Sequence, residues 1–182
     1  MVNMNKLKLT LLQQEILRFL FMNSGVVFNA RGIAVSLGVS QPAVSKALPL
    51  LKKHSFVSIS KDKQSKRLSI ELNRENSFII GMKRADNIKQ VYECGLVEVL
   101  KEKFPGCAVI LFGSFAKGED TQKSDIDIAV VGSKSKVVDL GEFEAILMKE
   151  IRLGFYASFK EINYELKCNI LGGMLLSGWV EL

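Results

Sequence analysis

Two aspartates stand two positions apart at the start of an apolar segment, residues 125–131. If this segment is a strand, Asp125 and Asp127 project their carboxylates from the same face, because side chains alternate along a strand. Hard divalent cations prefer carboxylate oxygens, and Mg²⁺ binds through one or two of them together with water and substrate phosphates. The pair therefore predicts a magnesium site. The competing interpretation is a solvated strand edge, where two aspartates on one face would be unusual.

A glycine-serine pair directly follows another apolar run, residues 107–112. Gly113 would let a phosphate approach the backbone and tolerates a positive φ, while Ser114 can donate its N–H and its hydroxyl to phosphate oxygens. Lys117 comes one helical turn later and would neutralise phosphate charge, or it is an ordinary surface lysine. Residues 113–118 lack the Gly-Lys-Ser/Thr ending of a P-loop, which argues against an ATPase of that type. The segment predicts a nucleotide phosphate site.

Taken together, the two segments resemble a known superfamily. The stretch Leu-Phe-Gly-Ser-Phe-Ala-Lys-Gly-Glu at 111–119, followed by Ser-Asp-Ile-Asp-Ile-Ala-Val at 124–130, is similar to the DNA polymerase β superfamily and most of all to its minimal nucleotidyltransferases. The resemblance spans roughly residues 83–182. It implies that Gly113 and Ser114 hold a nucleoside triphosphate such as ATP, and that Asp125 and Asp127 hold two Mg²⁺ ions. Two ions about 3.5–4 Å apart would activate an attacking hydroxyl and stabilise the leaving pyrophosphate.

A third carboxylate on a later strand completes the site in this superfamily and takes the proton from the attacking hydroxyl. The resemblance implies Glu161 for this catalytic and metal-binding role, in a strand expected at 158–166. The superfamily usually has aspartate there, so Glu161 is a departure, and Asn163 or Glu165 is an alternative. Otherwise Glu161 is a solvent-facing strand residue. Catalysis therefore depends on whether a carboxylate reaches the pair.

The first part of the chain has the pattern of a helix-turn-helix followed by a hairpin. Helices are expected at 11–22, at 30–37 and from 41 onward, preceded by the capping residues Thr10, Asn29 and Ser40. Residues 38–40 form the short, glycine-containing turn of this motif, and residues 56–60 and 68–72 alternate as two strands. With Leu-Gly-Val-Ser at 37–40, Val-Ser-Lys at 44–46 and Leu-Lys-Lys at 51–53, residues 7–73 resemble bacterial and archaeal winged-helix transcription regulators.

Basic residues dominate this first part. Residues 1–75 hold 12 Lys/Arg and 4 Asp/Glu, whereas residues 76–182 hold 13 and 15. In a winged helix this excess predicts contact with DNA phosphates, with the third helix presenting side chains to base edges. The predicted DNA-contacting residues are Ser40, Gln41, Ser45 and Lys46 in the helix, and Lys61, Lys63, Lys66 and Arg67 at the hairpin tip. The alternatives are a plain cap for Ser40, a solvent-facing Ser45 and a solvated turn at the tip.

One residue disagrees with a regular third helix. Proline removes a backbone donor and crowds the carbonyl four residues earlier. At Pro49 the helix is therefore expected either to kink or to end early.

The charge asymmetry predicts two domains, 1–75 and 76–182. A connector is expected at 73–81, and the second domain is expected to hold helices at 83–104 and about 140–155 and strands at 107–112, 126–131 and 158–166. The expected fold class is α+β: a winged helix of three helices plus a β-hairpin, then a small polymerase β-like nucleotidyltransferase domain with a mixed sheet flanked by helices. Trp179 and the apolar tail 170–182 are expected in the core or at a homodimer seam.

Other residues argue against other classes of protein. The three cysteines include no C-x-x-C pair, and the single histidine, His54, has no thiol at zinc-ligand spacing. Residues 1–10 lack the apolar core and cleavage site of a signal peptide. No apolar run approaches the ~18 residues of a membrane span. We expect a cytoplasmic protein with reduced cysteines and no membrane partner.

Two hypotheses about function follow from these patterns. The first is an enzyme that moves a nucleoside monophosphate from an NTP to a hydroxyl of a protein or nucleic acid, fused to a DNA-binding winged helix. Minimal nucleotidyltransferases of toxin–antitoxin pairs, which modify a toxin protein, are one model by resemblance. The second is a non-catalytic transcriptional regulator or antitoxin, whose second domain senses a nucleotide or binds a partner.

Overall fold

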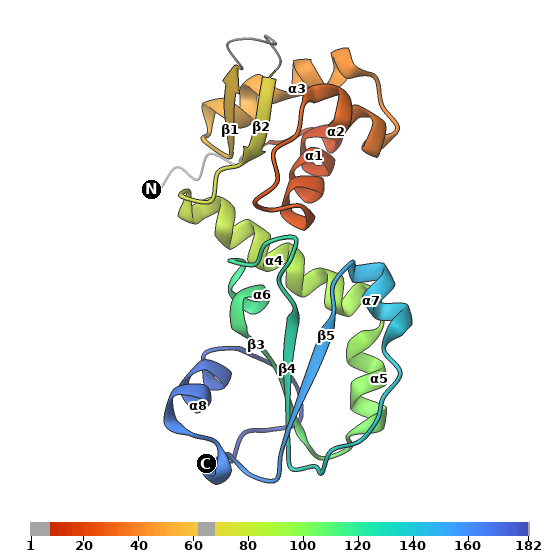
Figure 1. The fold of residues 1–182 in the computed structure, drawn as a ribbon, viewed down its shortest axis with the longest axis vertical. Coiled ribbons are helices and arrows are strands. Elements are labelled where there is room, and N and C mark those ends of the chain that lie inside the picture. The colour runs from red at the N-terminus through yellow and green to blue at the C-terminus, as the bar shows by residue number, and fades with distance from the viewer. Residues whose placement is uncertain (1–7, 62–67, 182) are drawn as a thin grey trace. The chain divides into compact units, whose positions relative to one another are not determined.

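The computed structural model describes residues 8–61 and 68–181. The chain divides into two compact units, Met1–Ile79 and Ile80–Leu182 (Figure 1). Helix α4 (Ser77–Glu93) contributes residues to both units. In the described part of the chain, no helix combines the length and the apolar character needed to cross a membrane.

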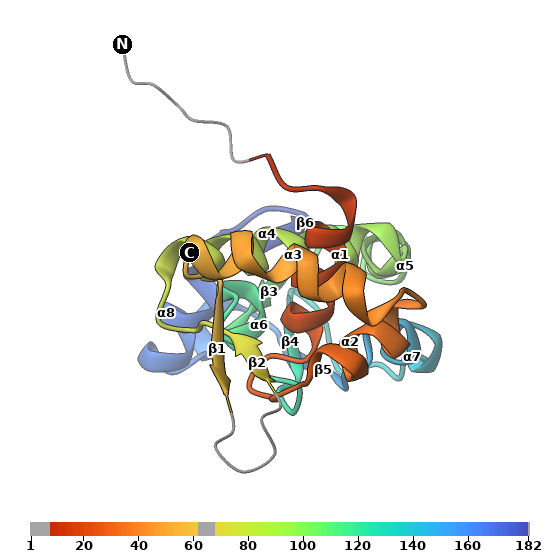
Figure 2. The same ribbon diagram turned by 90° about the horizontal axis from the view of Figure 1, so that it is seen from above.

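The first unit is a winged helix. Three helices, α1 (Leu11–Met22), α2 (Ala30–Leu37) and α3 (Gln41–Lys53), precede the strands β1 (Val57–Lys61) and β2 (Leu68–Leu72). The two strands pair antiparallel and lie side by side in Figure 2. Phe28 adds an antiparallel bridge to Ile70 of β2. The fold expected for this part of the chain is confirmed.

Side-chain caps start the three helices at the expected residues. Thr10 Oγ1 accepts the Gln13 N–H at 3.3 Å, and Gln13 Oε1 accepts the Thr10 N–H at 2.9 Å, which completes a capping box. The side chains of Asn29 and Ser40 cap α2 and α3. The buried Gln13 amide also donates to the Ala47 carbonyl at 3.2 Å, which joins α1 to α3. The apolar core between the elements includes Ile16, Leu20, Ile33, Val44, Leu51 and Ile70.

Helix α3 does not end at Pro49 but continues to Lys53. The side chains of Ser45 and Pro49 are both exposed, so the carbonyl that loses its donor is on the water-facing side of the helix. Solvent can hydrogen-bond a carbonyl on that side. The expectation of an early end at Pro49 is therefore wrong.

The second unit is built on a four-stranded mixed sheet in the order β5-β4-β3-β6. Its strands are β3 (Ala108–Phe112), β4 (Ile126–Val131), β5 (Ile151–Tyr156) and β6 (Met174–Ser177). β3 is antiparallel to both β4 and β6, and β4 is parallel to β5. A mixed sheet with flanking helices confirms the expected α+β class.

Alternation along β4 divides the core between the two faces of the sheet. Ile128 and Val130 pack in a cluster with residues of α4 and α5 (Leu96–Lys103), whereas Ala129 and Val131 pack with Ile170 of α8 (Tyr164–Leu171). Because side chains alternate, Asp127 shares the face of Ala129. The candidate carboxylates therefore lie on the side of the sheet that α8 covers.

Several expected boundaries in the second unit are corrected. The expected connector at 73–81 is already helical from Ser77, and the single helix at 83–104 is two helices, because Gly95 takes φ +83° between α4 and α5. The expected helix at 140–155 is the short α7 (Gly141–Leu147) followed by β5. The expected strand at 158–166 is instead a 3-10 turn, η1 (Phe159–Glu161), followed by the start of α8.

The apolar tail is split between core and surface. Ile170 and Leu176 are buried, whereas Trp179 is 65% exposed. Placing Trp179 in the core of this chain is therefore wrong. A homodimer seam at Trp179 stays a prediction.

Candidate functional site

The predicted phosphate segment lies where β3 ends. Phe112 is the last residue of β3 and pairs in register with Asp127 of β4. Gly113 follows with φ +74° and begins α6 (Gly113–Lys117). A β-carbon at position 113 would lie 2.5 Å from Asp127 Oδ2. A larger residue at this position would therefore be strained by the positive φ and would displace the carboxylate beside it.

The two aspartates are two positions apart, so their side chains lie on the same face of the sheet. Asp127 belongs to β4, and Asp125 immediately precedes that strand. Burial is the main cause that raises the pKa of Asp127; the like charge of Asp125 raises it further, and the Arg152 guanidinium opposes both effects. Two half-buried carboxylates that repel each other favour a nearby cation. Their oxygens fit one divalent ion that completes its coordination with water and phosphate.

A positively charged side chain, that of Arg152, lies beside this pair. Arg152 of β5 pairs in register with Asp127, and its Nη1 lies 2.7 Å from Asp125 Oδ2. Its Nε donates to Glu150 Oε1 at 3.2 Å. Sequence reasoning missed Arg152 because it assigned this segment to a helix. The signal that could have found it is the short apolar run 151–156, which is long enough for a strand and contains a glycine.

The structure does not bring Glu161 to the aspartates. η1 follows the end of β5, whereas Asp127 lies opposite the second residue of that strand. The four residue steps from Arg152 to Tyr156 span ~13 Å of strand. Residues just before Glu161 line a pocket at that far end of the strands, together with Ala108 and Val131. Among the described residues, no group of three His, Cys, Asp or Glu side chains is placed to hold a metal ion.

The two alternatives to Glu161 lie at the start of α8. Asn163 caps α8, with its Oδ1 accepting the Leu166 N–H at 2.9 Å. Glu165 is exposed in the first turn of that helix. The strand expected at 158–166 is wrong because the chain after β5 forms a turn and a helix. A catalytic or metal-binding role of Glu161 stays a prediction. Where we expected a third carboxylate beside Asp125, the structure has the guanidinium of Arg152.

The remaining predicted phosphate residues flank Gly113. Ser114 is the second residue of α6 and is half-buried. Lys117 is exposed, and its Nζ donates to Asn169 Oδ1 of α8 at 3.2 Å. Lys117 therefore lies between α6 and α8, on the α8 side of the sheet. Its contact with phosphate stays a prediction.

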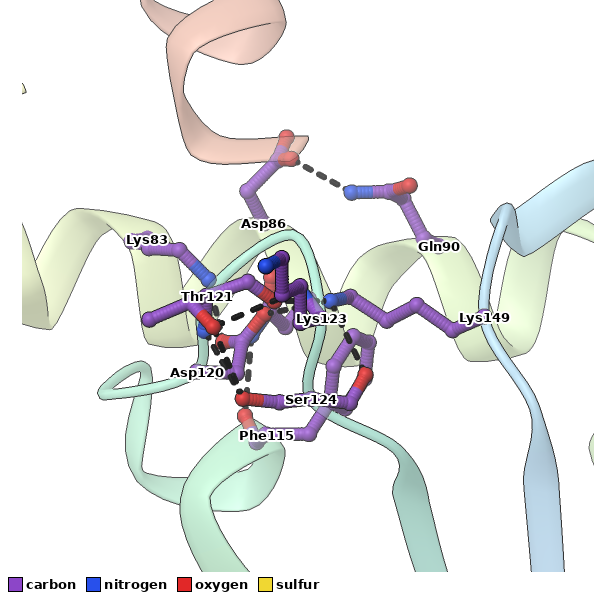
Figure 3. A network of polar contacts seen from close by, with 10 residues as sticks. Lys83, Asp86, Gln90, Phe115, Asp120, Thr121, Lys123, Ser124 and Lys149 are labelled. Atoms are coloured by element: carbon purple, nitrogen blue, oxygen red, sulfur yellow. Dashed lines mark hydrogen bonds and ion pairs between the residues drawn. The ribbon is translucent and has the colours of Figure 1, made fainter. Parts of the chain in front are cut away.

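A buried ionic cluster fixes the loop that joins the phosphate segment to the aspartates (Figure 3). Asp120 of this loop is 1% exposed and forms ion pairs with Lys83 and, at 3.2 Å, with Lys149. The Asn87 amide donates to the same carboxylate at 2.7 Å and to the Phe115 carbonyl at 2.9 Å. Burial lowers the pKa of Lys83, and the Asp120 charge partly offsets this effect.

The same cluster holds the loop backbone. Lys149 Nζ donates to the carbonyls of Thr121, at 2.5 Å, and Ser124, at 3.2 Å. Gly118 takes φ +76°, and a β-carbon there would lie 2.6 Å from the Ile80 carbonyl oxygen. The loop therefore packs directly on α4, which fixes the relative positions of Ser114 and Asp125. Sequence reasoning did not single out Lys83, Asp120 or Lys149, since no local pattern predicts that these distant charges are buried together.

The DNA-contacting residues predicted at the start of α3 are open to solvent. Ser40, Gln41, Ser45 and Lys46 are all exposed, and Ser40 also caps α3. Lys61 is exposed at the end of β1. Lys63, Lys66 and Arg67 lie outside the described residues. DNA contact by these residues stays a prediction.

Comparison with known proteins shows what the second unit is similar to. Residues 93–169, which lie within this unit, match the family model described as nucleotidyltransferase domain. The chain is similar to "Putative protein adenylyltransferase MJ1379" of Methanocaldococcus jannaschii, at 36% identity over 34% of this chain and 61% of that protein. It is also similar to MJ0604 of the same organism, which has the same descriptive name, at 53% identity over 20% of this chain and 38% of that protein. The chain thus spans less than two thirds of the length of the curated relatives it matches.

Solved structures that resemble this chain include two regulators. The Adhesin competence repressor of Streptococcus pyogenes matches at 22% identity and a TM-score of 0.42, over 56% of this chain and 71% of that chain. MepR, a transcription regulator of the Staphylococcus aureus multidrug efflux pump MepA, matches at 22% identity and a TM-score of 0.39, over 53% and 72%. The assignment of the first unit to the winged helices rests on its own helices and hairpin.

Proposed function

We propose that the second unit transfers a nucleoside monophosphate from an NTP to a hydroxyl acceptor, with release of pyrophosphate and with Mg²⁺ as cofactor. The observation that carries this proposal is the approach of the Asp127 carboxylate to Gly113, where a β-carbon would lie 2.5 Å from Oδ2. A carboxylate therefore lies beside the backbone to which the phosphates would bind. A triphosphate on Gly113 and Ser114 would therefore reach the carboxylates through a shared cation.

Asp125 and Asp127 would hold the divalent ion. When bound, such an ion polarises phosphate oxygens and offsets the charge of the leaving pyrophosphate. The chain's own residues bind and orient the substrate: Gly113 leaves room for the phosphates, Ser114 donates hydrogen bonds to them, and Lys117 contributes positive charge. The buried pair of Asp120 and Lys83 keeps the loop between these two parts of the site in place.

We propose ATP as the donor and a protein hydroxyl as the acceptor. Support comes from the relatives of Methanocaldococcus jannaschii, whose descriptive names are "Putative protein adenylyltransferase". The partner protein of a toxin–antitoxin pair is one acceptor of this kind. The winged helix would bring the enzyme to DNA through α3 and the hairpin.

Labelling with each [α-³²P]NTP and Mg²⁺ tests this function. The full chain is incubated with proteins that it captures from a lysate, and label transfer is compared with that of the Asp125→Asn/Asp127→Asn variant. We expect ATP to label a captured protein with the unchanged chain and no labelling with the variant. Equal labelling by both would contradict the proposal.

A second function is favoured by the contact between Arg152 and Asp125. Since no third carboxylate joins the pair among the described residues, the second unit could bind a nucleotide without transferring it and so regulate DNA binding by the first. In that case ATP changes the affinity of the chain for DNA while no NTP labels an acceptor. Measuring DNA affinity with and without ATP, beside the labelling assay, separates the two functions.

A further inference from the structure

Arg152 lies on the same sheet face as the candidate carboxylates. The register between the parallel strands β4 and β5 pairs Asp127 with Arg152, and alternation along β4 puts Asp125 on the face of Asp127. The guanidinium reaches Asp125 Oδ2 at 2.7 Å and is held on its other side by Glu150, at 3.2 Å. An arginine thus pairs with one of the two side chains that a divalent ion would need.

The guanidinium is nevertheless open to solvent. The Arg152 side chain is 58% exposed, the Asp125 side chain 28% and the Glu150 side chain 61%. An exposed ion pair of this kind is weak and easily exchanged for another partner. Because arginine stays protonated and its planar fork matches phosphate oxygens, its natural alternative partner is a phosphate group.

We propose that Arg152 is the built-in cation of this site, which pairs with Asp125 before the nucleotide binds and contacts the triphosphate once a divalent ion has taken Asp125. This role rests on the proposed function of the second unit. It assigns to Arg152 two effects of opposite sign: it weakens metal binding to the empty site and strengthens triphosphate binding to the metal-loaded site. A residue that only stabilised the fold would strengthen both.

Two binding measurements on the full chain test the two effects. The first is a Mn²⁺ titration without nucleotide, followed by the electron paramagnetic resonance signal of free Mn²⁺. We expect Arg152→Ala to tighten Mn²⁺ binding roughly 2- to 5-fold, the range that an exposed ion pair supplies. The second is calorimetric titration of the Mn²⁺-saturated chain with a non-hydrolysable ATP analogue, in which Arg152→Ala should weaken binding roughly 10-fold or more.

Two further variants serve as controls. Lys89→Ala removes the same charge from a side chain that is 59% exposed and also ion-paired, here with Glu93. It should change neither affinity. Arg152→Lys keeps the charge without the fork, so its Mn²⁺ affinity should stay near that of the unchanged chain while its affinity for the analogue lies between the other two.

The possible outcomes separate this role from the proposed function. If Arg152→Ala weakens both affinities, or changes neither, while Asp127→Asn abolishes Mn²⁺ binding, the role of Arg152 is wrong and the metal–nucleotide site stands. If Asp127→Asn leaves both Mn²⁺ and analogue binding unchanged, the proposed function itself fails, and the role of Arg152 fails with it.

Discussion

The Asp127 carboxylate lies against the backbone of Gly113, so close that a β-carbon at position 113 would stand 2.5 Å from Oδ2. Gly113 directly follows β3, whose last residue, Phe112, pairs with Asp127 of the neighbouring antiparallel strand β4. Gly113 also has φ +74°. The limited space and the positive φ therefore both favour glycine at this position. We expect the site to be most sensitive to substitution here.

We expect Gly113→Ala to lower the stability of the second unit and to abolish binding of metal and nucleotide. A left-handed backbone costs an alanine about 1–2 kcal/mol, and the contact with Asp127 adds to this cost by displacing the carboxylate. Urea unfolding followed by the fluorescence of the single tryptophan, Trp179, reports on this unit. Gly106→Ala is the matched control, because Gly106 has φ +76° and nothing within 4 Å of its β-carbon position. If the two variants lose equal stability and both bind nucleotide, the close contact has no role.

Among the residues of the loop, Asp120 should be the one whose substitution lowers stability most, because its carboxylate is buried. It is 1% exposed and faces the ammonium groups of Lys83 and Lys149. Asp120→Asn leaves two buried positive charges without their counter-ion, so we expect a loss of roughly 3–5 kcal/mol. The exposed variant Glu93→Gln, which removes one partner of a surface pair, should cost less than about 1 kcal/mol. Similar losses for the two variants would show that the buried cluster is not held together by charge.

The raised pKa of Asp127 predicts a pH-dependent effect on stability. Burial and the charge of Asp125 raise this pKa above its unfolded value, so the ionised carboxylate destabilises the folded unit at neutral pH. The penalty is absent below the unfolded pKa of about 3.9 and complete above the folded pKa. Asp127→Asn should therefore raise the melting temperature at pH values near 7, and this gain should shrink as the pH falls through the carboxyl range. Melting curves of the unchanged chain and of Asp127→Asn across this pH range check the prediction. A gain in melting temperature that does not depend on pH would show that the raised pKa of Asp127 is not its cause.

The sequence predicted the parts of the site that depend on neighbours along the chain. Gly113 and Asp127 were found because each directly follows or begins a short apolar run, and the caps Thr10 and Ser40 were found because capping depends on the next three residues. Arg152 was missed because its position beside Asp125 depends on the register between two strands, and β5 had been assigned to a helix. Local periodicity does not separate a short buried strand from a helix segment.

The same reason explains the error in the strand expected at 158–166, which was to carry Glu161. The chain there forms η1 and then α8, at the end of the strands away from Asp127. The buried ion pair of Lys83 with Asp120 was also beyond local reasoning, because 37 positions separate the two residues. The early end of α3 at Pro49, one of the two outcomes expected, is wrong because a local rule was applied too strictly to an exposed helix face. A kink at Pro49 stays a prediction.

Contact of the winged helix with DNA phosphates predicts a measurable salt dependence. Each lysine that neutralises a phosphate releases counter-ions, so the logarithm of the DNA affinity falls with the logarithm of the salt concentration. Lys46→Ala and Lys61→Ala, which remove exposed charges from α3 and β1, should each reduce this slope by about 1. Fluorescence anisotropy with a mixed-sequence duplex at several salt concentrations gives the slope. Lys101→Ala, which removes an exposed lysine of α5 in the second unit, is the control for net charge. An equal change of the slope in all three variants would mean that binding follows total charge rather than contact through the winged helix.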